Sequence, residues 1–495
     1  MGKVGRSAHV THDHDVLGGG GVGGEVTRRI GIRRLRTRRT PIRRIEDYDR
    51  RVRQVRKQLA ALPEGARPRL RKRTSNLFRP RQEGPGTLDA ALFDGVIDID
   101  VAARTADVGG MTTYEDLVAA TLQHGLLPLV VPELKTITLG GAVTGLGIES
   151  SSFRNGCPHE SVLEMDVLTG NGDVVTATAD NEHRDLFFAF PNSYGSLGYA
   201  LRLRIELEEA TPFVHLRHLR FDRLDAAVAA LERIVAEAAH NGERVDFVDG
   251  TWFSAHETYL SLGTYVATAP STSDYTGRDI YYRSIQQRTE DWLSVSDYIW
   301  RWDTDWFWCS RAFGAQNPVL RRVWPRRWRR SDVYWKLIAL NRRTGFADRL
   351  ERRRGNAARE EIVQDIEVPI QRTGEFVGFL TQLTGIQPVW LCPLRQRDPD
   401  RRWDLYALDP ATTYVNIGFW SSAALPPGQI DGFYNRQIEQ KVAELGGRKS
   451  LYSTVFYPRE EFWATYGGAT YAAVKRTYDS GSRLLDLYEK TVTHR

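Results

Sequence analysis

The stretch PELKTITLGGAVTGLGIESSS (residues 132–152) concentrates glycines and hydroxyl side chains. Glycine lets backbone N–H groups close on a pyrophosphate, and Thr and Ser side chains add hydrogen-bond donors. The stretch lacks the Gly-Lys-Ser/Thr ending of a Walker A loop, and it is not a GxGxxG run between a strand and a helix. From the glycines alone, a dinucleotide-binding loop and a turn-rich strand region without a ligand are equally consistent with the sequence.

The sequence around this stretch favours the dinucleotide. The supporting segments are GIESSS (147–152), Gly156, His159, Glu160, LTGNGDVV (168–175), NSYGSLG (192–198), VWLCP (389–393) and REEFW (459–463). Together they resemble the FAD-binding domain of the vanillyl-alcohol-oxidase (PCMH-type) superfamily. Within it they are most similar to the 24-dehydrocholesterol (delta-24 sterol) reductase family, also called seladin or Diminuto. The resemblance covers roughly residues 65–490.

The resemblance implies an α+β fold in which two subdomains hold FAD and an α+β cap domain covers the flavin. We expect the FAD-binding domain over residues 46–212, the cap or substrate domain over 213–445, and a C-terminal segment, 446–495, that returns to the first domain. Residues 1–45 are rich in arginine and poor in apolar side chains, so we expect a flexible tail there.

Local patterns agree with a mixed fold. Apolar spacing and flanking residues predict helices over residues 48–62, 113–124, 224–239, 460–466 and 471–478. Short apolar runs predict strands over residues 96–101, 105–108, 127–131, 163–168 and 174–177. Strands and helices therefore alternate over short distances, as in an α+β cofactor domain.

The resemblance also implies which residues contact FAD. It places Arg73, Thr74, Ser75 and Asn76 in a first phosphate-side turn. A second group of residues is expected around the pyrophosphate and the ribityl chain: Thr138, Leu139, Gly140, Gly141, Gly145, Gly147, Glu149 and Ser150. A third group is expected near the flavin or the adenine: Ser151, Arg154, His159 and Glu160. Many relatives attach FAD to a histidine in the first turn, and this turn has none, so FAD is expected to be non-covalent.

Reduction of an isolated carbon–carbon double bond in a lipid, the reaction that the resemblance implies, needs an acid. The alkene is electron-rich, so a proton must reach one carbon as a hydride reaches the other. The segment 292–308 combines tryptophans with Tyr298, Asp303 and Asp305, and Glu149 lies in the glycine-rich stretch. Aromatic faces can stabilise a developing cation, and a buried carboxyl has a raised pKa suited to proton donation. These four residues are the catalytic candidates; packing of the core or cap is the alternative for the tryptophans, and binding of a ribityl hydroxyl is the alternative for Glu149.

The expected electron donor follows from the family, and the expected substrate follows from the family together with the arginine-rich composition. NADPH or NADH is the expected donor. Arginine greatly outnumbers lysine, as in GC-rich bacteria, where methyl-branched fatty acids are common and sterol synthesis is not. We therefore expect reduction of a methylene-branched acyl chain of a phospholipid, formed by a lipid methyltransferase of the same pathway. The alternatives are a sterol side chain, an alcohol oxidised on the same FAD scaffold, and a non-catalytic lipid-binding protein.

Composition indicates where the chain acts. Three cysteines with no CxxC pair indicate neither a disulfide framework nor a zinc site, and no metal is expected. No apolar run has membrane-spanning length, and no signal peptide is apparent. We expect a cytoplasmic protein whose basic tail makes peripheral contact with the inner face of an anionic membrane. No nucleic-acid-binding motif is present, so no nucleic-acid partner is expected.

Overall fold

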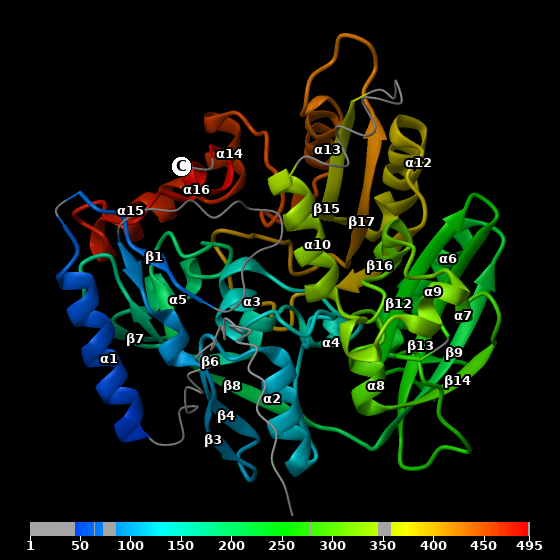
Figure 1. Cartoon of the computed structure of the whole chain (residues 1–495), viewed down its shortest axis with the longest axis horizontal. Coiled ribbons are helices and arrows are strands. Elements are labelled where there is room, and N and C mark those ends of the chain that lie inside the picture. Colours follow the sequence, from blue (N-terminus) through cyan, green and yellow to red (C-terminus); the bar gives the residue numbers. More distant parts are fainter. Residues whose placement is uncertain (1–44, 64, 73–85, 278, 345–357, 494–495) are drawn as a thin grey trace, which may run out of the picture. The chain divides into compact units, whose positions relative to one another are not determined.

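Two β-sheets organise the chain, shown in the computed structural model of Figure 1. The structure describes residues 45–63, 65–72, 86–277, 279–344 and 358–493. The predicted tail and the predicted first phosphate-side turn, Arg73 to Asn76, lie outside the described residues.

The first sheet is antiparallel and has strand order β3-β4-β8-β6-β7, with β5 paired to β8. Its strands are β3 (Val96–Asp100), β4 (Thr105–Gly109), β5 (Leu126–Pro128), β6 (Val162–Leu168), β7 (Val174–Thr178) and β8 (Tyr199–Glu209). The helices near it are α1 (Ile45–Ala60), α2 (Tyr114–Thr121) and α5 (Arg184–Ala189), whereas the short helix α4 (Ser152–Asn155) packs on the second sheet. These elements confirm the strands and helices predicted before residue 180, although β5 is shorter than expected.

The second sheet has eight strands in the order β14-β9-β13-β12-β16-β17-β15-β18. Its strands are β9 (Phe213–Phe221), β12 (Phe247–Ser254), β13 (Glu257–Val266), β14 (Glu290–Ser294), β15 (Arg359–Pro369), β16 (Val389–Leu394), β17 (Tyr414–Ala424) and β18 (Arg448–Lys449). Its helices are α6 (Leu224–Glu237), α12 (Thr373–Thr384) and α13 (Phe433–Glu444). Helix α6 buries Ala227, Leu231 and Ile234 at helical spacing, which explains why the sequence pattern located it.

Among the described residues, three α-helices lie between β14 and β15 in the sequence. They are α8 (Val295–Ile299), α9 (Pro318–Val323) and α10 (Ser331–Thr344). A further short helix, α7 (Tyr281–Ser284), comes before β14. Aromatic side chains in this part of the chain pack on one another: Trp302 stacks on Phe307 with ring centres 4.7 Å apart, and Tyr281 meets Trp302 edge-on at 4.8 Å. No helix of the described residues has the length and apolar character needed to cross a membrane.

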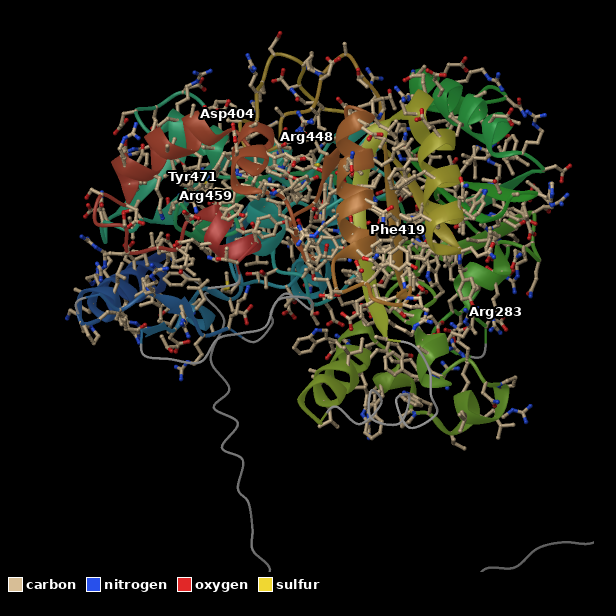
Figure 2. All side chains as sticks on the ribbon, turned by 90° about the horizontal axis from the view of Figure 1, so that it is seen from above. Arg283, Asp404, Phe419, Arg448, Arg459 and Tyr471 are labelled. Atoms are coloured by element: carbon tan, nitrogen blue, oxygen red, sulfur yellow. The ribbon has the colours of Figure 1, made fainter. Side chains whose placement is uncertain are left out.

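The C-terminal helices lie against the first sheet's side of the chain. They are α14 (Arg459–Thr465), α15 (Gly468–Tyr478) and α16 (Leu487–Thr491). Tyr478 donates a hydrogen bond to Asp185 of α5 over 2.8 Å, and the Lys475 ammonium donates to the carbonyl of Ser196 over 2.7 Å. In Figure 2, Arg459 and Tyr471 mark these helices and Phe419 marks the second sheet. The predicted helices over 460–466 and 471–478 are therefore confirmed.

One apolar core joins the two sheets. It contains Val108 and Leu203 of the first sheet together with Val214 and Leu216 of the second, and it extends to the buried Trp302. Because both sheets bury side chains in this core, close packing holds the two sheets in fixed positions relative to each other. The segments between the two sheets are therefore held in place for a site that draws on both.

Candidate functional site

The glycine-rich stretch forms a short helix, α3 (Leu139–Gly145), rather than a loop. Thr138 caps it, because its hydroxyl accepts a hydrogen bond from the backbone N–H of Gly141 over 3.2 Å. A Cβ at Gly140 would lie 2.6 Å from the carbonyl oxygen of Gly110, which is closer than real side chains allow. The glycine at 140 therefore lets α3 pack directly on the backbone that follows β4.

A cavity of about 1290 Å³ opens beside α3. Five of the residues predicted to contact the cofactor line it: Thr138, Gly140, Gly141, Gly145 and Gly147. The loop before β8 contributes Tyr194, Gly195 and Gly198. Ligand pockets for small molecules occupy about 300–1,000 Å³, so this cavity is larger than a site for one small ligand usually is.

The residues of this wall fit FAD. Glycines expose their backbone to the cavity, the hydroxyls of Thr138 and Thr144 lie beside them, and Arg69, Lys72 and Lys490 line the same space. Backbone N–H groups, hydroxyls and cations are the groups that bind a pyrophosphate. This donor set supports the prediction that the stretch holds a dinucleotide.

Other predicted cofactor residues do not line the cavity. Leu139 is buried in the core, and the Ser151 hydroxyl donates to the carbonyl of Leu129 over 2.9 Å. Arg154 forms an ion pair with Glu208 over 2.7 Å. Burial lowers the pKa of His159 to about 3, and its ring meets Trp403 edge-on at 4.5 Å.

Glu160 also lies away from the cavity. Its carboxylate accepts hydrogen bonds from the backbone N–H of Cys157 over 2.9 Å and of Arg397 over 2.7 Å. Burial raises the pKa of Glu160 to about 7. Glu160 therefore links the backbone at Cys157 to the backbone at Arg397 and does not lie beside α3.

Glu149 and Tyr298, two of the predicted catalytic residues, meet in a buried network behind the cavity wall. The Ser150 hydroxyl contacts the Glu149 carboxylate and lies 2.8 Å from the Tyr298 hydroxyl. Arg301, fully buried, pairs with Glu149 over 3.1 Å and with Asp249 over 3.0 Å. Neither Glu149 nor Tyr298 lines the cavity. The network therefore stabilises the structure behind the cavity wall and does not contact a ligand.

Glu133 connects this network to the cavity. It is buried and lines the cavity, and one of its carboxylate oxygens has no hydrogen-bond partner among the described residues. Burial raises its pKa well above the ordinary value, and the neighbouring charge of Glu149 raises it further.

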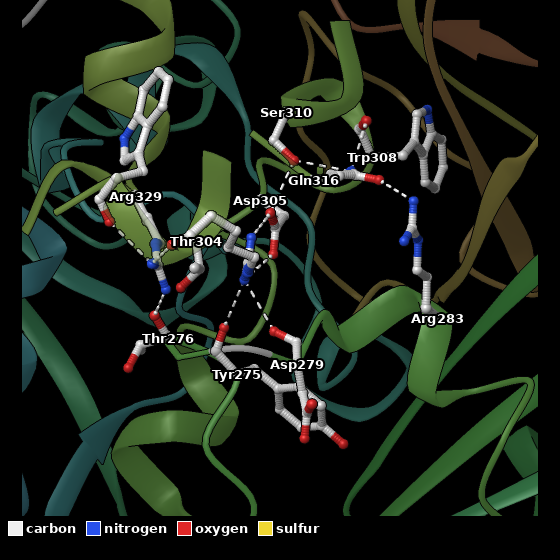
Figure 3. A network of polar contacts seen from close by, with 12 residues as sticks. Tyr275, Thr276, Asp279, Arg283, Thr304, Asp305, Trp308, Ser310, Gln316 and Arg329 are labelled. Carbon is white, nitrogen blue, oxygen red and sulfur yellow. Dashed lines mark hydrogen bonds and ion pairs between the residues drawn. The ribbon is translucent and has the colours of Figure 1, made fainter. Parts of the chain in front are cut away.

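Asp303 and Asp305, the other two catalytic candidates, are tied to structural partners. Both oxygens of Asp305 accept from Arg321, over 2.7 and 3.1 Å, and Ser310 donates to one of them over 2.8 Å (Figure 3). Asp303 accepts from Ser331 over 2.6 Å and from the backbone N–H of Lys135 over 3.1 Å. Neither residue lines the cavity. Of the aromatic residues in segment 292–308, Trp306 and Phe307 line it, and the others pack in the core or on the sheet.

A second part of the cavity wall contains a carboxyl that the sequence patterns did not indicate. Asp365 of β15 is half-buried and lines the cavity beside Asn416, Trp420 and Tyr452. The Asn416 amide donates to Asp365 over 3.3 Å, and Trp420 donates to the Tyr452 hydroxyl over 3.1 Å. Burial raises the pKa of Asp365 to about 6. The sequence offered no distinctive signal, because Asp365 is one of four acidic residues in the strand sequence REEIVQDIEVP (359–369).

This wall also offers polar and aromatic groups to a ligand. The Asn416 amide oxygen is buried and has no hydrogen-bond partner among the described residues, as expected of a group that faces a ligand. Trp390 and Trp420 line the cavity with ring centres 6.5 Å apart, and the ring of Phe307 lies 4.3 Å from that of Trp420. The cavity thus joins a glycine-rich wall to an aromatic wall with a carboxyl.

Comparison with known proteins agrees with this site. A family model described as FAD binding domain matches residues 52–178. The chain is 22% identical to the Delta(24)-sterol reductase of Arabidopsis thaliana over 447 residues, covering 82% of this chain and 76% of the relative. It is 25% identical to the Delta(24)-sterol reductase of Homo sapiens over 411 residues, covering 80% and 75%.

A partial similarity adds a second kind of relative. Cytokinin dehydrogenase 6 of Oryza sativa subsp. japonica is 32% identical over 189 residues, covering 34% of this chain and 36% of the relative. The sheets, the cavity and these similarities lead to one conclusion. The chain has the α+β fold of PCMH-type flavoproteins and is an FAD-binding oxidoreductase related to the Delta(24)-sterol reductases.

Proposed function

We propose that the protein reduces an isolated carbon–carbon double bond in a lipid, with FAD as cofactor and NADPH or NADH as electron donor. The observation that carries this proposal is that one cavity is lined both by the glycine-rich stretch and by Asp365, a carboxyl whose pKa burial raises to about 6. In the overall reaction the nicotinamide gives two electrons as a hydride equivalent, a proton comes from solvent, and the alkene becomes an alkane.

Each wall has its own part in this reaction. The wall formed by Thr138, Gly140, Gly141, Gly145 and Gly147 would hold FAD, with Arg69, Lys72 and Lys490 beside it. When bound, FAD supplies a two-electron carrier that accepts hydride from a nicotinamide and gives hydride to a substrate. The second wall then has to bind the alkene and provide the proton.

Asp365 is the proton donor in this proposal. A pKa of about 6 leaves part of its population protonated near neutral pH, and a general acid works best with a pKa close to the operating pH. The hydrogen bond from Asn416 orients the carboxyl. Asp365 therefore combines access to the cavity with the acidity that the reaction needs.

The aromatic residues of the cavity suit the charge that protonation creates. Trp306, Phe307, Trp390 and Trp420 line the same space as Asp365. An aromatic face attracts a cation by about 0.5–2 kcal/mol, depending on how fully water is excluded. The same rings offer apolar surface to a hydrocarbon chain.

A methylene-branched acyl chain of a phospholipid is the substrate that we propose. Protonating its terminal methylene gives a tertiary cation, as does protonating the double bond of a delta-24 sterol side chain. A lipid methyltransferase would form the methylene branch. A sterol side chain is the second candidate, favoured by the similarity to proteins named Delta(24)-sterol reductase.

A substrate panel tests the proposal. We expect purified enzyme with NADPH to convert a methylene-branched acyl phospholipid to the methyl-branched product, measured by mass spectrometry. Reduction of a delta-24 sterol alone would move the proposal to the second candidate. Oxidation of an alcohol with oxygen or an artificial acceptor, without reduction of either alkene, would contradict it.

We expect all of the flavin to be released when the protein is precipitated with acid. The predicted first turn, Arg73 to Asn76, has no histidine, and no histidine or cysteine lines the part of the cavity formed by described residues. The flavin absorbance of supernatant and pellet measures the outcome. Flavin that stays in the washed pellet would show a covalent bond.

A further inference from the structure

Exposed apolar side chains are concentrated in one segment of the chain, residues 319–340. Nine large apolar residues are exposed among those that the structure describes, and six of them lie between residues 319 and 340. We call this the α9–α10 surface; its six residues are Val319, Leu320, Val323, Trp328, Leu337 and Leu340. Val319 is 69% exposed and Val323 is 75% exposed. Such a concentration of exposed apolar side chains marks an interaction site.

The surface is also basic. Residues 306–340 contain eight Lys and Arg residues and one acidic residue, Asp332. The exposed basic side chains are Arg311, Arg322, Arg326, Arg327 and Lys336. Cations around an apolar face are typical of segments that rest in the interface of an anionic bilayer. A second copy of the same face would bring like charges together, so this surface is poorly suited to self-association.

Buried arginines hold the α9–α10 surface in place. Arg321 pairs with Asp305, and Arg329 donates to the carbonyls of Thr276 and Trp324, each over 2.9 Å (Figure 3). Arg330 pairs with Glu115 of α2 over 2.7 Å. The exposed apolar residues are therefore presented by an anchored segment.

Helix α10 connects this surface to the cavity. Trp335, Ile338 and Ala339 line the cavity, whereas Leu337 and Leu340 of the same helix are exposed. Lys336 and Arg330 line the cavity as well. One helix thus separates the proposed lipid site from the apolar surface.

We propose that the α9–α10 surface inserts its apolar side chains into the interface of an anionic bilayer, so that a lipid chain passes along α10 into the cavity. The nature of that lipid rests on the proposed function, whereas the contact with the bilayer does not. The basic side chains meet anionic headgroups, and the valines of α9 meet the acyl region. The contact is additional to any attraction from the basic tail.

Sedimentation with vesicles tests the contact on the full-length protein. The probes are phosphatidylcholine vesicles with and without phosphatidylglycerol, at one fixed salt concentration, so that the tail contributes equally to the binding of every variant. We expect the protein to sediment with the anionic vesicles, and the double variant Val319→Asp/Val323→Asp to bind them at least about tenfold more weakly. Val101→Asp/Ile430→Asp is the matched control, because both residues are exposed and apolar but lie outside the surface. This control should bind like the unchanged protein.

Measurements of folding and of oligomeric state distinguish bilayer contact from misfolding and from dimer formation. All variants should keep their flavin absorbance and their unfolding temperature, since the substituted side chains are exposed. The contact is overturned if the double variant binds as tightly as the unchanged protein, or if the control loses as much. It is also overturned if sedimentation equilibrium shows a dimer that Val319→Asp/Val323→Asp dissociates. Failure to reduce any alkene would overturn the proposed function and leave vesicle binding untouched.

Discussion

Replacing Asp365 by asparagine should lower the rate of double-bond reduction about 100-fold or more, because a positioned general acid contributes about 10²–10⁴-fold. Asparagine keeps the size of the side chain and can still bond to Asn416, but it cannot give a proton to the alkene. Single-turnover rates with prereduced enzyme measure the effect on chemistry apart from the supply of electrons. The flavin content should stay at that of the unchanged protein.

The pH dependence of the rate tests the role of Asp365 in a second way. Asp365 must be protonated to act, and its pKa is about 6, so the rate of the unchanged enzyme should fall as pH rises above that value. The variant should lose this dependence. Glu361→Gln on the same strand is the matched control, since Glu361 is exposed and does not line the cavity. A full rate in Asp365→Asn, or a loss that only follows lost flavin, would contradict the role of Asp365.

Replacing Gly141 by valine should weaken FAD binding about 100-fold, the upper range of what overpacking costs in a closely packed site. A Cβ at Gly141 would lie 2.8 Å from the Thr138 hydroxyl that caps α3, and the branched side chain would take space in the cavity. Flavin fluorescence titration of the apoprotein measures the affinity.

Gly374→Val is the matched control for this variant. Gly374 lies in the first turn of α12, has ordinary helical geometry, and has no atom within 4 Å of an added Cβ. It should bind FAD normally. Normal FAD binding by Gly141→Val would show that the dinucleotide lies elsewhere, and unfolding of Gly141→Val alone would show that the glycine serves α3 only.

The glycine-rich side of the cavity is evident in the sequence because its signal is local. Glycines 140, 141, 145 and 147 stand within eight residues, and their spacing brings them to one cavity. The conformation of the stretch was less accessible. Thr138 caps a helix there, although the many glycines favoured a loop.

The proposed acid, Asp365, could not be predicted in the same way because its raised pKa depends on residues that are distant in the sequence. Asp303 and Asp305 stand among tryptophans in the sequence, yet Arg321 and Ser331 engage them in the fold. Asp365 acquires its raised pKa by burial between strands, and its neighbours Asn416 and Tyr452 lie more than fifty residues away along the chain. Pairing and burial of this kind are tertiary properties.

The α9–α10 surface is a further case. From the sequence we predicted a membrane contact at the arginine-rich tail, because charge can be read from composition. Whether Val319 and Val323 face solvent or the core depends on how Arg321 and Arg329 anchor the segment. An apolar residue in the sequence is more often buried than exposed, so such a surface stays hidden until the fold is known.

Labelling by solvent tests the central claim most directly. The enzyme is incubated in heavy water with NADPH and a methylene-branched acyl phospholipid, and the product is fragmented by mass spectrometry. The proposal predicts a saturated branch whose new methyl carbon carries one solvent deuterium, because the proton donor exchanges with water. A hydrogen at the branch carbon can also exchange before transfer, so the position of the label decides and not the number of labels. A saturated product without deuterium on the methyl carbon would contradict protonation of the alkene, and with it the account of the aromatic wall and Asp365.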